Sequence, residues 1–127
     1  MNSSVSSSIS EQEQNFFVVG IGASAGGLRA LEEFFEHMPT DSGAAFVVIQ
    51  HLSPDFKSLM KELLERRTRM AIYRVKEGMV LQPNSVYLIP PGKNLVLENR
   101  KLHLLEQEER SRHGLNFPID IFLESLA

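Results

Sequence analysis

Residues 16–38 read FFVVGIGASAGGLRALEEFFEHM and contain the clearest structural pattern of the sequence. Its first part, Phe16 to Gly22, is an apolar run ending in glycines, which is typical of a strand buried on both faces of a parallel sheet. After Gly26-Gly27, apolar residues recur at spacings of three and four until Pro39. These residues are Leu28, Leu31, Phe34, Phe35 and Met38. The pattern therefore predicts a strand, a glycine turn and an amphipathic helix in succession.

A second apolar run, AAFVVI at residues 44–49, follows this helix and ends at Gln50-His51. A strand, a helix and a second strand in succession predict a right-handed parallel unit. Ser53-Pro54 is typical of a helix start, and helical spacing continues from Phe56 to Leu64. A third strand is predicted at residues 71–75.

Beyond Gly78 the sequence is divided by turn signals rich in Pro, Gly and Asn, and short apolar runs at 86–89, 95–97 and 102–105 predict hairpins. Residues 106–116 are charged and predict a solvated loop, and the pattern after Pro118 predicts a helix. The fold class expected is α/β, a doubly wound, mostly parallel, Rossmann-like sheet in three layers with a hairpin section. Residues 1–15 contain six serines and predict a disordered leader before a single domain at 16–127.

Composition excludes several classes of function. The chain of 127 residues has a net charge of −3, so it lacks the electrostatic footprint of a nucleic-acid binder. It has no cysteine, so disulfides, a thiolate nucleophile and cysteine-based metal sites are ruled out. The four histidines show no metal-ligand spacing, and neither a metal nor a cofactor is expected. Without an apolar run long enough for a membrane span or a signal peptide, we expect no membrane insertion and a cytoplasmic location.

The glycine turn has three interpretations. Gly20, Gly22 and Ala25 fit the dinucleotide-binding pattern G-x-G-x-x-G/A, although the acidic residue that should end the second strand is replaced by Gln50-His51. Residues 22–26 also fit G-x-S-x-G, the strand-to-helix turn that exposes a nucleophilic serine, here Ser24. In the third interpretation Ser24 only caps the helix and the glycines only make the turn.

His51 favours the nucleophile. It follows an apolar strand at the carboxyl end, where ligands and catalytic groups gather in open α/β sheets. If the first two strands are neighbours, about 4.8 Å apart, the side chains of Ser24 and His51 emerge from adjacent strand ends and could share a hydrogen bond. A serine at such a turn needs a base, and His51 is placed to supply one.

Four segments carry a resemblance to a known family, in the family's order and approximate spacing. They are VGIGASAGG at 19–27, VVIQHLSP at 47–54, VYLIPPG at 86–92, and the stretch from Pro118-Ile119-Asp120 to Ser125-Leu126-Ala127. The chain resembles the catalytic domain of the chemotaxis protein-glutamate methylesterases (CheB). The resemblance implies a serine hydrolase that demethylates glutamate methyl esters, and deamidates glutamines, on the cytoplasmic helices of chemoreceptors.

By motif position, the resemblance implies that Ser24 is the nucleophile, His51 its general base, and the amide of Ala25 part of the oxyanion hole. Ala25 stands where the family often has threonine. The family's triad aspartate lies in a later glycine-rich segment that this sequence does not contain, so a domain truncated at the C-terminus and nearly inactive alone is expected. The Ala25 variant and the short leader resemble the N-terminal head of fused methylesterase–methyltransferase proteins. The alternative is a non-catalytic module that binds or senses a partner on the same scaffold.

Overall fold

The computed structural model describes residues 16–23, 27–50, 59–90, 92–106 and 118–126. The elements in these ranges are β1 (Val18–Ala23), α2 (Leu28–His37), β2 (Ala45–Gln50), α3 (Met60–Glu65), β3 (Ala71–Arg74), β4 (Met79–Val80), β5 (Ser85–Leu88), β6 (Lys93–Glu98), β7 (Lys101–Glu106) and α4 (Pro118–Leu126). The predicted strand–helix–strand unit is confirmed, as is the helix that begins at Pro118. The predicted leader and the helix start at Ser53-Pro54 lie outside the described residues.

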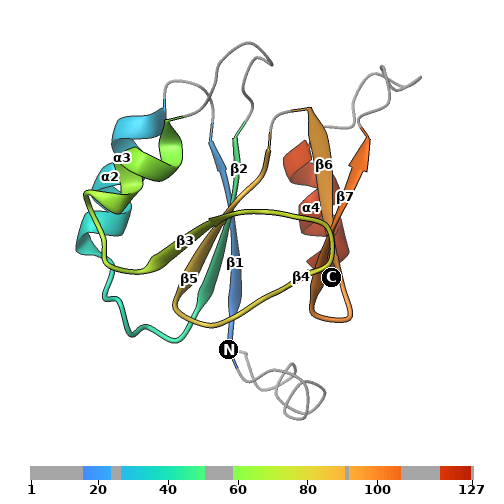
Figure 1. Cartoon of the computed structure of the whole chain (residues 1–127), viewed down its shortest axis with the longest axis horizontal. Helices are drawn as coiled ribbons and strands as arrows, with labels where there is room; N and C mark the ends of the chain where they lie inside the picture. Colours follow the sequence, from blue (N-terminus) through green and yellow to red (C-terminus); the bar gives the residue numbers. More distant parts are fainter. Residues whose placement is uncertain (1–15, 24–26, 51–58, 91, 107–117, 127) are drawn as a thin grey trace.

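Four of these strands form a parallel sheet in the order β1-β2-β5-β3. The central strand β2 is buried from Ala45 to Ile49, because the sheet is covered on both faces. On one face α2 and α3 pack over the apolar side chains of Phe46, Val48 and Val86. On the other face lie α4 and a small antiparallel sheet in the order β4-β7-β6. The result is the expected three-layer α/β fold (Figure 1).

The prediction for residues 86–89 was wrong in one respect. They were expected in a hairpin, whereas β5 is a parallel strand between β2 and β3, with Val86 opposite both Phe46 and Ile72. All four residues of β5 are buried, so the segment suits the centre of a sheet rather than an exposed hairpin. The hydroxyl of Tyr87 accepts a hydrogen bond from the Gln82 amide at 2.7 Å, which satisfies that oxygen.

The hairpin prediction holds for the next two strands. β6 and β7 pair antiparallel from Lys93↔Glu106 to Glu98↔Lys101. Both turn residues between them have positive φ, 55° at Asn99 and 65° at Arg100, which matches the right-handed twist of the flanking strands. Glu106, predicted to open the solvated loop, ends β7 instead. Residues 107–116 of that predicted loop lie outside the described residues.

Helix α4 is tied to the edge of β6 through one serine. The Ser125 hydroxyl accepts a hydrogen bond from the Leu97 amide at 3.0 Å and donates one to the Phe122 carbonyl at 2.6 Å. Phe122 itself is fully buried between the two sheets. The helix therefore closes one side of the second apolar core.

Candidate active site

The candidate catalytic residues follow two strands that end at the carboxyl edge of the parallel sheet. In β1 and β2 the register ends with Ala23 opposite Gln50. Ser24 and His51 are the next residues in sequence after these two partners. Ser24, Ala25 and His51 themselves lie outside the described residues, so the structure describes the two strand ends that carry them. The predicted pairing of the first two strands is confirmed.

Helix α2 begins at this same edge of the sheet, with Gly27 as its N-cap residue. Its first turn contains no acidic residue. Ser24 lies outside the described residues, so its interpretation as a helix cap stays a prediction. The positive end of the α2 dipole faces this edge without a carboxylate in the first turn to neutralise it.

Packing explains why residue 20 is a glycine, without any role in binding a dinucleotide. A Cβ at Gly20 would lie 3.0 Å from Leu123 Cδ2 and 3.3 Å from Phe122 Cε2. The glycine is required because α4 packs directly on β1 at this position. The first glycine of the G-x-G-x-x-G/A pattern thus serves helix packing.

The two histidines that lie within the described residues each contact a glutamate. His37 Nδ1 is 2.9 Å from the Glu33 carbonyl oxygen on α2. His103 Nδ1 is 2.7 Å from Glu77 Oε2 on the outside of the small sheet. The His103 hydrogen bond, with a second from the Leu104 amide, lowers the pKa of Glu77. In the part of the chain that the structure describes, no group of three or more candidate ligands could hold a metal ion.

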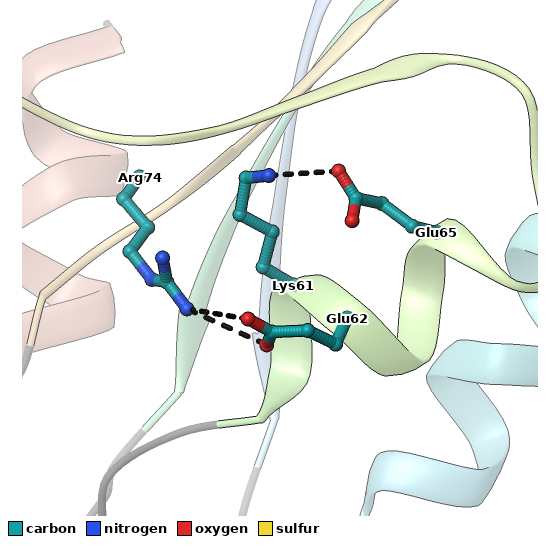
Figure 2. Close-up of polar contacts among 4 residues, drawn as sticks. All are labelled: Lys61, Glu62, Glu65 and Arg74. Carbon is teal, nitrogen blue, oxygen red and sulfur yellow. Dashed lines mark hydrogen bonds and ion pairs between the residues drawn. The ribbon is translucent and has the colours of Figure 1, made fainter.

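Ion pairs flank the carboxyl edge, and sequence reasoning did not find them. Lys93, at the start of β6, pairs with Glu106, at the end of β7, at 2.5 Å. Arg74, at the end of β3, pairs with Glu62 of α3 at 3.4 Å (Figure 2). The Glu62 pKa is lowered, first by its own backbone amide and then by Arg74. The partners are 13 and 12 residues apart, so no local pattern in the sequence indicates them.

These features define a class: a doubly wound α/β protein with a strand–glycine turn–helix unit at the carboxyl edge of its sheet. None of its described helices is long and apolar enough to cross a membrane. The chain belongs to the CheB methylesterase family, whose model matches residues 19–127. The family expected from the sequence is therefore confirmed.

Named relatives agree with this assignment. The chain is 32% identical over 112 residues to a protein-glutamate methylesterase/protein-glutamine glutaminase of Geobacillus kaustophilus, covering 87% of this chain and 32% of that protein. A Burkholderia lata protein of the same name is 35% identical over 114 residues, with the same coverage. One from Xanthomonas oryzae pv. oryzae is 41% identical over 78 residues, covering 61% of this chain and 22% of that protein. The chain thus spans about a third or less of the length of these relatives.

A solved structure gives the same answer for the fold. The catalytic domain of the Thermotoga maritima CheB methylesterase superposes with a TM-score of 0.72 at 25% sequence identity. The match covers 87% of this chain and 60% of that domain. The α/β class predicted from the sequence is the class of this neighbour.

Proposed function

We propose that residues 16–127 form part of a protein-glutamate methylesterase site in which Ser24 is the nucleophile and His51 the general base. The register of β1 and β2 carries the proposal. Ala23 and Gln50 are opposite one another, and neighbouring parallel strands lie about 4.8 Å apart. The strand ends that Ser24 and His51 follow in the sequence are therefore neighbours at one edge of the sheet, which supports the pairing of a serine with a histidine there.

The proposed reaction is hydrolysis of a glutamate methyl ester in two steps. Ser24 Oγ attacks the ester carbonyl carbon while His51 takes its proton. The C–O bond to the methoxy group then breaks, and His51 returns the proton so that methanol leaves. Water, activated by His51, attacks the acyl-serine, and the products are the glutamate side chain and free Ser24.

The negative charge that develops on the carbonyl oxygen is stabilised by hydrogen-bond donors that are in position before the reaction. The N-terminus of α2 supports the proposal here, because its positive end faces this edge without an acidic residue in the first turn. The amide of Ala25 is proposed to donate to the same oxygen. No step of this scheme calls on a metal or a cofactor.

The substrate proposed is a methylated glutamate on a cytoplasmic helix of a chemoreceptor, and a glutamine at such a position is the amide counterpart. The name of the relatives, protein-glutamate methylesterase/protein-glutamine glutaminase, supports both reactions. The third member of the family's triad, an aspartate in a glycine-rich segment, is absent from this sequence. Loss of a triad aspartate costs about four orders of magnitude in rate, so we expect slow turnover from this chain alone.

The test is covalent labelling by a fluorophosphonate probe, followed by mass spectrometry over long incubations. We expect the chain to take up one probe at Ser24 and the Ser24→Ala variant to take up none. His51→Gln should slow labelling by about 10²-fold or more, because the base is removed. Release of methanol from a receptor-type peptide that contains a glutamate methyl ester should follow the same order.

The matched control is Ser42→Ala. Ser42 is an exposed serine at the opposite edge of the sheet, where it accepts a hydrogen bond from the Ala44 amide. Its loss should leave labelling unchanged. Equal labelling of the chain and its Ser24→Ala variant would overturn the proposal and favour a module that binds a partner without catalysis.

A further inference from the structure

A lysine of the small sheet lies at the carboxyl edge of the parallel sheet. The amide of Ile89, just after β5, donates a hydrogen bond to the Val48 carbonyl of β2 at 3.2 Å, so the chain stays beside β2 as β5 ends. Lys93, the first residue of β6, follows four residues later, a span of at most about 14 Å. In Figure 1 the end of β7, which pairs with the start of β6, lies at the same end of the molecule as the carboxyl ends of β1 and β2. Lys93 therefore begins β6 at the edge where the proposed site lies.

The Lys93 side chain lies on the face of β6 that packs toward the parallel sheet. Side chains alternate along a strand, so Lys93 shares a face with Leu95 and Leu97. Both leucines pack in the second apolar core, which includes Val47 and Ile49 of β2. Lys93 is the next position on that face toward the carboxyl edge. Its ammonium group is therefore placed just beyond the apolar core, toward the ends of the parallel strands.

The ion pair that holds this ammonium group is exchangeable. Lys93 pairs with Glu106, which lies opposite it on β7. The Glu106 side chain is 82% exposed and the Lys93 side chain 35% exposed, so the carboxylate is largely hydrated. Ion pairs of this exposure add little to stability, because water solvates both charges. A carboxylate from another molecule can therefore replace Glu106 at little cost to the fold.

Arg74, a second cation at this edge, is less suited to bind such a carboxylate. Its guanidinium group contacts both carboxylate oxygens of Glu62 at 3.4 Å (Figure 2). The strand that carries Arg74 is separated from β2 by β5. Lys93, in contrast, follows leucines that share an apolar core with β2 itself. Lys93 is thus the better placed of these two cations to meet a substrate at the ends of β1 and β2.

We infer that Lys93 binds a carboxylate of the substrate helix, one to two turns away from the methyl ester that is hydrolysed. The inference rests on the function proposed above. Packed layers lie about 10 Å apart, which sets the distance between Lys93 and the strand ends that Ser24 and His51 follow. On a helix, residues four and seven positions apart share a face and are separated by about 6 and 10 Å. The group that Lys93 recognises is thus a second, acidic side chain and not the reacting ester.

The charges of substrate and chain explain why a separate cation matters. A glutamate methyl ester and a glutamine are both neutral, so neither reacting group attracts the ammonium group of Lys93. The chain has a net charge of −3, which does not draw an acidic partner from a distance. A single cation at the site therefore confers a preference for an acidic helix. That preference applies equally to the ester and to the amide.

The test is the binding of two helical peptides, measured by fluorescence anisotropy with the Ser24→Ala variant so that the ester persists. Both peptides carry one glutamate methyl ester, and they differ in having glutamates or glutamines at the positions one and two turns away. We expect the acidic peptide to bind about 10-fold more tightly at low salt, with a smaller difference at high ionic strength. Adding Lys93→Gln should abolish the difference. Lys101→Gln is the matched control, because Lys101 is an exposed lysine at the other end of the same hairpin.

Glu106→Gln separates recognition of a carboxylate from a merely structural cross-strand pair. It removes the carboxylate that competes for Lys93, so the inference requires tighter binding of the acidic peptide, with circular dichroism to confirm that each variant is folded. Unchanged or weaker binding by Glu106→Gln overturns the inference.

Equal affinity for the two peptides, no measurable binding of either, or a preference that survives Lys93→Gln also overturns it. Failure of the proposed function is observed separately, by a fluorophosphonate probe without a carboxylate. In an otherwise unmodified chain, Lys93→Gln should leave labelling of Ser24 by that probe unchanged.

Discussion

Gly20 lies where α4 crosses β1, and the position has no room for a side chain. The atoms that an added methyl group would meet differ in character: Leu123 Cδ2 is the end of a flexible, partly exposed side chain, while the Phe122 ring is fully buried. A small side chain could displace Leu123, but a branched one must also push against Phe122. The contact between helix and strand therefore depends on one missing Cβ.

We expect Gly20→Val to lower the free energy of unfolding by about 1–3 kcal/mol, the usual cost of inserting volume into a packed contact. Urea denaturation followed by circular dichroism measures it. In a Leu123→Ala background the cost should shrink, because the nearest obstructing atom has been removed. A valine that costs the same in both backgrounds would show that Leu123 plays no part in excluding it.

Ser24 and His51 illustrate what a sequence can indicate about a site. A serine between glycines after an apolar run, and a histidine at the end of the next such run, suffice to predict two neighbouring strand ends. The confirmed register of Ala23 with Gln50 bears out that part of the prediction. The roles of the two residues stay a prediction, because they depend on the positions of side-chain atoms that spacing alone does not determine.

At the scale of elements, β4 is too short to pair with all of β7. A side chain accepts a hydrogen bond from β7 beyond the end of β4. β4 pairs with β7 only at Met79↔Leu102 and Val80↔Lys101. Glu77, just before β4, accepts a hydrogen bond from the Leu104 amide at 2.8 Å and pairs with His103 at 2.7 Å. The carboxylate thus occupies the place where a longer β4 would have supplied a carbonyl group.

We expect this contact to stabilise the fold only while Glu77 is ionised. Its pKa is lowered from 4.5, because the hydrogen bonds from His103 and Leu104 favour the carboxylate. A carboxylate with a depressed pKa stabilises the folded state above the unfolded value, and the contribution is lost as pH falls through the folded value. Glu77→Gln should therefore lower the Tm at neutral pH and make little difference well below pH 4.5.

Thermal melts of the chain and of Glu77→Gln across this pH range measure the effect. Glu33→Gln, an exposed glutamate on α2, is the control for a change of surface charge alone. A Tm difference for Glu77→Gln that is constant from neutral pH to below pH 4.5 would mean that the charge of Glu77 does not contribute.

β5 shows why the order of strands was harder to predict than their existence. Its residues were found by their apolar character, but the Pro, Gly and Asn around them favoured a hairpin. Their place between β2 and β3 depends on pairing across the chain, with Val86 opposite residues 40 and 14 positions away. Ser85 and Tyr87 carry hydroxyl groups and are nevertheless buried, because the backbone of Pro83 and Gln82 supplies their hydrogen-bond partners.

At the scale of the whole molecule, burial decreases from the centre of the sheet to the β1 edge. β2 and β5 lie inside the sheet and are buried, while β1 is half-exposed. Central strands open only with global unfolding, whereas edge elements open locally at lower cost. In the described part of the chain, β1 is therefore expected to open more readily than β2 and β5.

Hydrogen exchange read by mass spectrometry measures this difference. In this chain we expect β1 amides to exchange much faster than those of β2 and β5, because β1 is only half-buried. Protection of β1 equal to that of β2 would contradict the expected order.

The overall architecture was predictable because each apolar run had the period of its element. The strand–helix–strand unit and α4 are local, so their residues are sufficient to indicate them. The two-residue strand β4 and the flanking ion pairs depend on contacts between distant segments. Short elements of this kind carry too few residues for a periodic pattern.

The connection between α2 and β2, at the amino edge of the parallel sheet, is a suitable place to insert a tag. The segment from Met38 to Gly43 joins α2 to β2 there, and Thr40 and Asp41 are exposed. The candidate residues follow the other ends of β1 and β2, about 20 Å away along a strand of six residues. A fluorescent or affinity tag inserted between Thr40 and Asp41 would report on the chain while leaving the carboxyl edge, where the proposed site lies, unobstructed.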